Sequence, residues 1–314
     1  VISPFDTFAD QLILAMREPG CYRLLSWLTA PLDAELEKEH EPPRGPWVVC
    51  GHGRFGHAVS RRLIAEGLQV TAVDPAHDDG DADPAEGLPA RLRGVGTETE
   101  VLARAGIDEA VGLVAAADND VTNLAIAALA RSRNPKLFVV LRQNEAANQV
   151  LFDAFRADMV MKPSEIIADE CVALLTTPLL DRFLAVVRRK NDAWADEVIH
   201  QLRKRVGTRS PRAWTVRLDP AEAPAVSARL HAESRPMTIG ELLRDPRNRK
   251  DRLPAQALML SRGGGELLLP NDDTALAAGD RILFAGRGDA RRRMQAALFD
   301  EKLLEYLCTG RDTP

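Results

Sequence analysis

The sequence predicts a doubly wound α/β domain, a parallel sheet with helices on both faces, followed by a smaller α+β lobe. Three observations support this fold class. Apolar strand-like runs alternate with helical patterns between residues 47 and 161, a glycine-rich loop follows the first run, and the pattern changes after Pro211. Strands that alternate with helices form a parallel sheet, because each crossover helix packs back onto the sheet.

Composition restricts the class of protein. The chain has 314 residues, 45% hydrophobic and 28% charged, which suits about two globular domains. Its 41 Lys and Arg against 46 Asp and Glu give a net charge of −5, so no positive field favours a nucleic-acid partner. No apolar run reaches the roughly 18 residues that a membrane-spanning helix needs. The four cysteines, Cys21, Cys50, Cys171 and Cys308, contain no C-x-x-C pair, which is typical of reduced thiols.

The first 25 residues resemble a later segment of the same chain, residues 160–184, at a constant offset. The alignment pairs Pro4 with Pro163, Pro19 with Pro178, and Leu12 with Cys171, which we therefore expect in a core. In both copies a proline precedes apolar residues at helical spacing, as at the start of an amphipathic helix. We interpret residues 1–30 as the end of an upstream unit, although two unrelated amphipathic helices would also look alike.

Residues 31–46 are first charged and then rich in proline, which is typical of an exposed linker. The chain begins at Val1, without Met and without a signal-peptide pattern. We therefore expect it to be a fragment of a larger protein.

Residues 47–162 carry the alternating pattern. The expected strands are residues 47–50, 69–73, 90–93, 111–115, 137–141 and 159–161, and the expected helices are residues 54–66, 97–105, 119–131 and 145–155. For the third of these helices, Asp118 or Asn119 is expected to act as the N-cap. Its buried stripe is expected to consist of Val121, Leu124, Ala125, Ala128 and Leu129.

Residues 163–211 are expected to form helices and a linker, and residues 212–300 a small α+β lobe. The expected elements of the lobe are a strand at 213–218, a helix opened by the capping box Thr238–Glu241, a hairpin through Gly263–Gly265, a strand at 281–285 and a helix from Asp289. Residues 301–314 are expected to be a C-terminal helix or tail.

The most specific chemical signal is Gly51-His52-Gly53-Arg54-Phe55-Gly56, which follows a strand and opens a helix. In this motif the first glycine permits the tight turn, the second lets the backbone approach a pyrophosphate, and the third allows close helix–strand packing. The helix N-terminus attracts the phosphates. Asp74, at the end of the second strand, is placed to accept hydrogen bonds from ribose hydroxyls and would repel a 2′-phosphate. NAD or an adenine nucleotide is therefore favoured over NADP.

Further candidates lie at the carboxyl ends of other strands, where ligands bind in open parallel sheets. These are Gly94–Thr97, Asp118–Asp120 and Arg142, with Asn123 one helical turn beyond. The complete set of candidate cofactor-binding residues is Gly51, Gly53, Arg54, Phe55, Gly56, Asp74, Gly94, Thr97, Asp118, Asn119, Asn123 and Arg142. We assign no catalytic residue and no metal ligand.

In this order the motifs resemble the TrkA-N domain, also called the RCK or KTN domain, which regulates potassium channels and transporters. The resemblance rests on the glycine loop, Asp74, G-x-x-T at 94–97, D-N-D-x-x-N at 118–123 and K-P-S-E-I at 162–166. The sequence LLLPNDDTALAAGDRILFAG resembles the accompanying TrkA-C lobe. One position departs from the family, which commonly has G-D-A-T where this chain has Gly94-Val95-Gly96-Thr97, so a carboxylate on the adenine side is lost.

The resemblance implies a Rossmann-like doubly wound sheet with a crossover helix and a small α+β C-terminal lobe. It implies that the glycines of the loop and Arg54 hold phosphates, that Asp74 holds ribose, and that Thr97 and Asp118 border the nucleotide. The cofactor would be NAD(H) or an adenine nucleotide (ATP, ADP or AMP); a divalent cation has no support in the residues.

The resemblance also implies partners. These would be a second copy, in a homodimer or higher ring assembled through the crossover helix, and a potassium channel pore or transporter subunit. The protein would then lie on the cytosolic side of the inner membrane. Residues 1–30 would be the crossover region of a preceding RCK domain in a tandem-RCK protein.

Two other functions remain open. An NAD-dependent oxidoreductase would need a catalytic His or Lys in the second domain, and residues 213–285 offer no marked candidate. A dimerisation scaffold with a degenerate site is disfavoured by the intact glycines. The acidic run Asp78–Asp83 is better explained as a solvated loop than as a calcium loop, because Pro84 stands in place of the required glycine.

Overall fold

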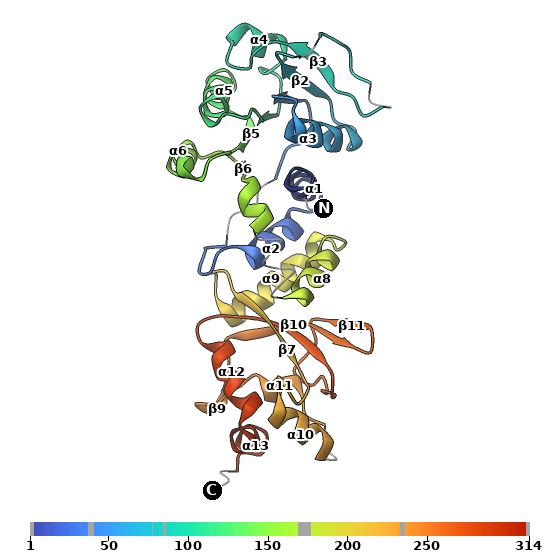
Figure 1. The fold of residues 1–314 in the computed structure, drawn as a ribbon, viewed down its shortest axis with the longest axis vertical. Helices are drawn as coiled ribbons and strands as arrows, with labels where there is room; N and C mark the ends of the chain where they lie inside the picture. The colour runs from blue at the N-terminus through green and yellow to red at the C-terminus, as the bar shows by residue number, and fades with distance from the viewer. Residues whose placement is uncertain are drawn as a thin grey trace. The chain divides into compact units, whose positions relative to one another are not determined.

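The computed structural model describes residues 3–36, 41–76, 78–83, 86–168, 177–232 and 236–311. The chain divides into two compact units, whose elements are labelled in Figure 1. Unit 1 comprises Val1–Tyr22 and Glu39–Cys171, and unit 2 comprises Arg23–Lys38 and Val172–Pro314. Residues 169–176 of the repeated segment, which include Cys171, and Pro84 lie outside the described residues. Within the described ranges no helix is both long enough and apolar enough to cross a bilayer.

Unit 1 is built on a six-stranded parallel sheet in the order β3-β2-β1-β4-β5-β6. The strands are β1 (Trp47–Cys50), β2 (Val70–Asp74), β3 (Ala90–Arg93), β4 (Gly112–Ala115), β5 (Phe138–Arg142) and β6 (Met159–Met161). The helices are α1 (Pro4–Arg17), α3 (Arg54–Ala65), α4 (Thr99–Arg104), α5 (Asp120–Arg133), the short η1 (Ala146–Asn148) and α6 (Gln149–Phe155). This strand order is that of a Rossmann fold, with its switch point between β1 and β4. The predicted doubly wound sheet is confirmed.

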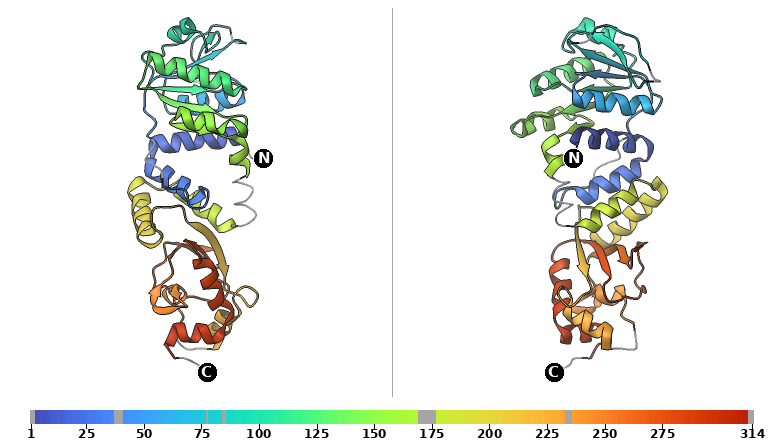
Figure 2. Two further views of the ribbon diagram at one scale, coloured as in Figure 1. Left: turned by 90° about the vertical axis from the view of Figure 1, so that its left-hand side faces the viewer. Right: turned by 45° about the vertical axis from the view of Figure 1, so that its right-hand side comes forward.

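The central strand β1 explains why the sheet needs cover on both faces. All four of its residues are buried, and their side chains alternate between two cores. Val48 and Cys50 pack in the core that includes residues of α4 and α5, and Trp47 and Val49 pack in the core that includes α3 and α1. Figure 2 shows the sheet with helices on either side.

Helix α1 packs against α3, far along the chain, as Figure 1 shows. The rings of Phe8 and Phe55 meet edge-to-face with centroids 5.6 Å apart. At the rim of this contact, Arg62 of α3 pairs with Asp10 at 2.5 Å. Ser3 caps α1 by accepting a hydrogen bond from the N–H of Asp6. The N-terminal helix is therefore an integral part of the core of unit 1.

The prolines that the sequence comparison matched stand at equivalent structural positions. Pro4 begins α1 and Pro163 begins a helix described as far as Ala168. Pro19 begins α2 (Pro19–Thr29) and Pro178 begins α8 (Pro178–Val187). Proline suits the first helical position, because its fixed φ is helical and its missing N–H has no intrahelical role there. The origin of residues 1–30 in a preceding RCK domain stays a prediction.

The expected buried stripe of α5 is wrong at Val121, Ala125 and Ala128, which are exposed, whereas Leu124 and Leu129 are half-buried and pack against the core. Val121 is 68% exposed, and the buried residues of the helix are Asp120, Asn123, Ile126, Ala127 and Ala130. Apolar residues of α5 occur on every side of the helix, so their spacing alone does not identify the face that packs against the sheet. The structure buries the polar Asn123 because its amide is satisfied by backbone groups, as described below. Asn119 is the N-cap, since its side chain accepts from the N–H of Thr122.

Unit 2 contains a four-stranded antiparallel sheet in the order β11-β10-β12-β7 and a separate two-stranded sheet, β8-β9. The strands are β7 (Arg212–Arg217), β8 (Arg244–Asp245), β9 (Asn248–Arg252), β10 (Ala255–Arg262), β11 (Gly265–Leu268) and β12 (Arg281–Gly286). The helices after α8 are α9 (Asp192–Val206), α10 (Pro224–Ala232), α11 (Ile239–Leu242), α12 (Ala290–Phe299) and α13 (Glu301–Thr309). The expected capping box at Thr238 and Glu241 is present. The sequence analysis missed α10 and the β8-β9 pair.

A fully buried carboxylate joins two strands of this lobe. Asp280 precedes β12 and accepts two hydrogen bonds at 2.7 Å from the guanidinium of Arg262, at the end of β10. It also accepts from the N–H of Ala277 at 2.8 Å. Because a buried charge is tolerated only when it is paired and hydrogen-bonded, this arrangement holds the turn before β12 to the β10 hairpin.

Shortening a side chain of α1 that is buried against α3 should destabilise unit 1. Leu12 is fully buried, so Leu12→Ala is expected to lower the free energy of unfolding by about 3 kcal/mol through lost burial and a residual cavity. Hydrogen exchange of the β1 and β4 amides, followed by mass spectrometry, measures this change. Gln11→Ala on the same helix is the control and should leave the exchange unchanged. Unaltered exchange in Leu12→Ala would contradict an integral role for α1.

Candidate functional site

The glycine loop brings the end of β1 against the first turn of α3. Gly51 has φ +92°, and a Cβ there would lie 2.9 Å from the backbone at Ala116 and Ala117, beyond the end of β4. A Cβ on Gly56 would lie 2.0 Å from the carbonyl oxygen of Gly51. Only glycine fits either position, because real Cβ atoms do not approach backbone so closely. These two residues are therefore required by the fold itself.

Gly53 differs from its two neighbours in the motif. Its φ of −68° suits any residue, and a Cβ there would meet no atom within 4 Å. It is also the N-cap of α3, so this helix has no side-chain cap. Within the part of the chain that the structure describes, the N–H groups of Arg54, Phe55 and Gly56 donate to no acceptor. The loop thus presents three free donors, a helix dipole and open space, which together favour an anion.

The carboxylate of Asp74 fixes the loop from the end of β2. One oxygen accepts from the N–H of His52 at 2.7 Å and the other from the N–H of Ala76 at 2.9 Å. Asp74 follows Gly53 by 21 positions, the spacing of the ribose-binding acid in dinucleotide folds, which is about 20 residues.

Arg142 and Asp118 meet beside the loop, from the ends of β5 and β4. Arg142 Nη1 donates to Asp118 Oδ1 at 2.5 Å, and the Asp118 side chain is 90% exposed. Asn123 is fully buried and plays a different part. Its side-chain oxygen accepts from the N–H of Ala117, and its Nδ2 donates to the carbonyl oxygens of Ala117 and Arg142. Asn123 therefore ties β4 to β5 and presents no free polar atom to a ligand.

Asp120 organises the segment after β5. Its carboxylate accepts from the N–H groups of Asn144 and Glu145 at 2.6 and 3.0 Å, and from the Nδ2 groups of Asn144 and Asn148 at 2.9 and 2.8 Å. Although desolvation opposes ionisation, the bonds from Asn148, Asn144 and Glu145 hold the pKa of Asp120 below its usual value. Sequence reasoning missed this role; the signal was a second acidic residue in the D-N-D run.

The remaining candidates lie along the β2 and β3 side of the site. The N–H of Gly94 donates to the carbonyl of Asp74 at 3.4 Å, and a Cβ on Gly96 would lie 2.9 Å from Cys50 Sγ. Thr97 is exposed. Burial raises the pKa of the Cys50 thiol to about 12, so this cysteine remains a neutral thiol behind the loop.

One residue outside the predicted set also contacts the site. The ring of Phe5, in the first turn of α1, lies under the guanidinium groups of both Arg54 and Arg142, at 5.2 and 5.4 Å from the ring centroid. It also lies 6.1 Å from the ring of Phe55. The repeated segment has Ser164 at the matching position, so an aromatic residue in only one copy was the available signal. Phe5 thus links α1 to two candidate phosphate-binding arginines.

The structure therefore joins the glycine loop, Asp74, Arg142 and Asp118 at the carboxyl ends of the strands. It assigns Asn119 to helix capping and Asn123 to the scaffold. The acidic run does not form a metal cluster among the described residues. Asp79 instead accepts from the N–H of Arg93 at 2.6 Å and pairs with Arg104 at 3.2 Å.

Comparison with known proteins identifies the domain. Residues 47–163 match the TrkA-N domain family. They form a TrkA-N domain. This TrkA-N domain contains the complete six-stranded sheet and every candidate residue named from the sequence, whereas α1 precedes it.

Two curated relatives belong to potassium transport systems. The Trk system potassium uptake protein TrkA homolog of Pyrococcus abyssi is 28% identical over 144 residues, covering 44% of this chain and 63% of that protein. The probable potassium channel protein 2 of Methanocaldococcus jannaschii is 26% identical over 162 residues, covering 50% of this chain and 46% of that protein. The chain thus matches less than two thirds of either relative.

Solved structures also resemble the chain in part. The structure titled GsuK channel bound to NAD is 18% identical, with a TM-score of 0.38, over 84% of this chain and 40% of that one.

The Asp120 network predicts a pH dependence in the TrkA-N domain. Because the pKa of Asp120 is lower in the folded protein than in the unfolded chain, its contribution to stability is complete above pH ~4 and is lost as pH falls through the folded pKa. Protection of the Asn144 and Glu145 amides from hydrogen exchange should therefore persist to below pH 4 and then disappear. Asp120→Asn should remove this protection at neutral pH. Equal protection in Asp120→Asn and the natural chain would refute the network.

Proposed function

We propose that the TrkA-N domain binds NAD(H) or an adenine nucleotide, and that this ligand regulates potassium transport by an associated channel or transporter without being consumed. The names of the two curated relatives, a potassium uptake protein and a probable potassium channel, support the transport process. The site itself supports the ligand class. The single observation that carries the proposal is the uncapped N-terminus of α3 behind the open space at Gly53.

The phosphates of the nucleotide would lie over Gly53. Free N–H groups at Arg54, Phe55 and Gly56 supply hydrogen bonds to phosphate oxygens, and the helix dipole favours their charge. Arg54 and Arg142 add guanidinium groups that match phosphate geometry. A residue with a Cβ would fill the space at Gly53, so this glycine serves the ligand more than the fold.

The ribose would lie toward Asp74. Its carboxylate, at the end of β2, is placed to accept hydrogen bonds from ribose hydroxyls. The negative charge disfavours a 2′-phosphate, so NADP(H) should bind more weakly than NAD(H). On the adenine side, Val95 stands where the family commonly has Asp. Contacts to the base therefore depend on groups other than a carboxylate at that position.

Helix α1 is the element that we expect to transmit the effect of nucleotide binding to the rest of the protein. Phe5 contacts Arg54 and Arg142, so phosphates that hold these guanidinium groups over the ring also hold α1 in place. A ligand shifts an equilibrium only when it interacts differently with the two states. In this proposal the difference is the contact of both arginines with the ring of Phe5, which bound phosphates strengthen.

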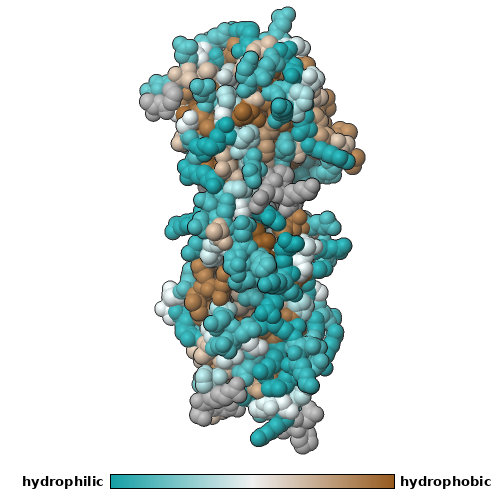
Figure 3. Space-filling model, turned by 180° about the vertical axis from the view of Figure 1, so that it is seen from behind, coloured by the Kyte–Doolittle hydropathy of each residue, from teal (hydrophilic) through white to brown (hydrophobic). Residues whose placement is uncertain are grey.

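Assembly with further copies is part of the proposal. Val150 and Leu151 of α6 are 77% and 52% exposed, and they follow the segment held by Asp120. Figure 3 shows apolar side chains at the right-hand edge, where α6 lies. Exposed apolar residues grouped on one element are typical of protein contacts. We expect a homodimer or ring, with a pore or transporter subunit as the other partner.

Gly53→Ala separates the proposed ligand role from the fold. The new methyl group meets no protein atom, so the melting temperature without ligand should not change. Affinity for NAD(H), ATP, ADP or AMP, whichever binds the natural chain, should fall by more than about tenfold, equivalent to about 1.4 kcal/mol. Isothermal titration calorimetry and thermal shift with each nucleotide measure this change.

Two further glycine variants control this experiment. Gly265→Ala, in a hairpin of unit 2 with ordinary space for a Cβ, should change neither stability nor affinity. Gly56→Ala should disrupt the fold, because its Cβ would collide with the carbonyl of Gly51. The proposal fails if none of the nucleotides binds the natural chain or if Gly53→Ala binds as the natural chain does.

Phe5→Leu tests the route through α1. Leucine keeps an apolar contact with Phe55 but removes the ring under both arginines, so nucleotide affinity should fall about twofold to fivefold, in line with ~0.5–1 kcal/mol for a cation–π contact. Nucleotide should slow hydrogen exchange in α1 of the natural chain and not in Phe5→Leu. Phe8→Leu, whose ring contacts Phe55 and no arginine, is the control. If nucleotide leaves hydrogen exchange in α1 of the natural chain unchanged, α1 does not transmit the effect of binding.

A further inference from the structure

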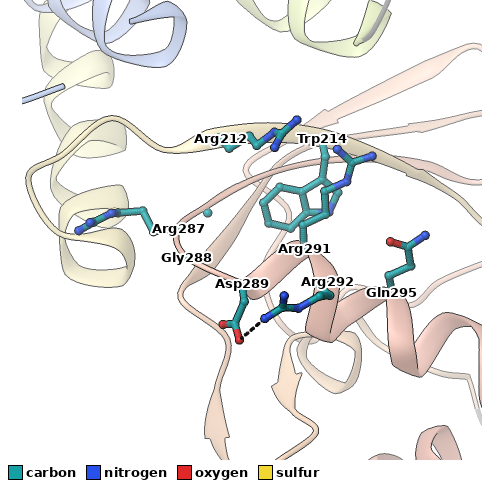
Figure 4. A pocket seen from close by; sticks show the side chains of 9 residues that line it. Arg212, Trp214, Arg287, Gly288, Asp289, Arg291, Arg292 and Gln295 are labelled. Carbon is teal, nitrogen blue, oxygen red and sulfur yellow. Dashed lines mark hydrogen bonds and ion pairs between the residues drawn. The ribbon is translucent and has the colours of Figure 1, made fainter. Parts of the chain in front are cut away.

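A pocket in unit 2 has the properties of a second anion site, independent of the TrkA-N domain. It has a volume of about 250 Å³ and lies between the start of β7 and the loop that joins β12 to α12. We call it the arginine pocket. Its charged and aromatic lining consists of Arg212, Trp214, Arg287, Asp289, Arg291 and Arg292, as Figure 4 shows.

The charges of the arginine pocket do not cancel. Asp289 is its one acidic lining residue, and this carboxylate pairs with Arg292 of the pocket at 3.4 Å and with Arg247 and Arg293, each at 2.7 Å, which do not line it. Arg287 pairs with Asp33 at 3.1 Å. Arg212 and Arg291 are exposed and have no ion-pair partner in the described ranges. The pocket therefore retains an excess of positive charge.

The loop before α12 repeats the geometry that makes the β1–α3 loop an anion site. A strand ends at Gly286, Gly288 has φ +60°, and a helix of ten residues begins at Ala290. Asp289 is the N-cap, but its side chain does not cap the helix. Among the described residues, the N–H groups of Arg291 and Arg292 donate to no acceptor. These donors and the helix dipole favour an oxyanion at this point.

Trp214 supplies an independent indication of a ligand. Its side chain is 3% exposed, lines the pocket and stacks on Phe284 with centroids 5.8 Å apart. The indole Nε1 has no hydrogen-bond partner among the described residues. Figure 4 shows the indole between the side chains of Arg212 and Arg291. A buried donor without a partner costs about 1–3 kcal/mol, so this wall of the pocket holds an unsatisfied polar group.

We propose that the arginine pocket binds a phosphorylated small molecule through its phosphate group. The phosphate accepts hydrogen bonds from the N–H groups of Arg291 and Arg292 and from the guanidinium groups of Arg212 and Arg291. Arginine suits this role because its planar fork matches phosphate oxygens. The volume is below the roughly 300–1,000 Å³ typical of drug-sized ligand sites, so the molecule is small.

The test measures pyrophosphate binding to the full chain carrying Gly53→Ala, so that the loop of the TrkA-N domain does not contribute. Titration calorimetry should detect one bound pyrophosphate per chain. Addition of Arg212→Gln and Arg291→Gln should weaken this binding at least tenfold. Because both side chains are exposed and unpaired, the melting temperature without ligand should not change. Pyrophosphate should also slow hydrogen exchange at the amides of Arg291 and Arg292.

A matched control removes the same charge from another part of unit 2. Arg188→Gln with Arg189→Gln, both exposed near the end of α8, should leave pyrophosphate binding unchanged. The proposal is overturned if the chain with Gly53→Ala binds no pyrophosphate, if both double variants bind equally, or if succinate at the same concentration binds more tightly. Failure of nucleotide binding in the TrkA-N domain leaves these outcomes unaffected, so the two proposals fail separately.

Discussion

The close approach of Gly56 to the carbonyl oxygen of Gly51 is the contact on which the site depends. The first turn of α3 packs so closely against the loop after β1 that there is no room for a Cβ at residue 56. This position leaves the first N–H groups of α3 without acceptors at the switch point of the sheet. It also directs Phe55 into the core, where it meets Phe8 of α1. One backbone contact thus determines both the anion-binding donors and the surface on which α1 packs.

Asp74 and Asp120 stabilise this arrangement from the two sides of the switch point. Asp74 holds the loop by the N–H of His52, and Asp120 holds the segment after β5 by two N–H groups and two side-chain amides. Charge-assisted bonds of this kind are stronger than neutral ones, so the loops at the strand ends are ordered before a ligand arrives. A site ordered in advance loses less entropy on binding, which favours affinity.

The sequence predicts the alternation of strands and helices well, because period-2 and period-3.6 patterns follow from burial on two faces. It also predicts Gly51 and Gly56, because both belong to a recognisable motif between a strand and a helix. It does not predict which face of α5 is buried, because Val121 and Ile126 are both apolar. In the structure Val121 is exposed and Ile126 is buried. It places Asn123 at the ligand, whereas the tertiary structure commits that amide to Ala117 and Arg142. Phe5 and Trp214 acquire their roles from residues far along the chain, so no local pattern marks them.

The two proposed anion sites arise from the same physical arrangement in different folds. In each, a glycine lies at or directly after the end of a strand, a helix begins without a side-chain cap, and arginines stand beside the free N–H groups. A recognisable motif marks only the first, because close packing against β1 requires its glycines, whereas the loop before α12 has open space at Gly288. If both proposals hold, two phosphorylated ligands bind one chain. If both ligands favour the same state of the protein, each raises the affinity of the other by an equal factor, since coupling between binding sites is reciprocal.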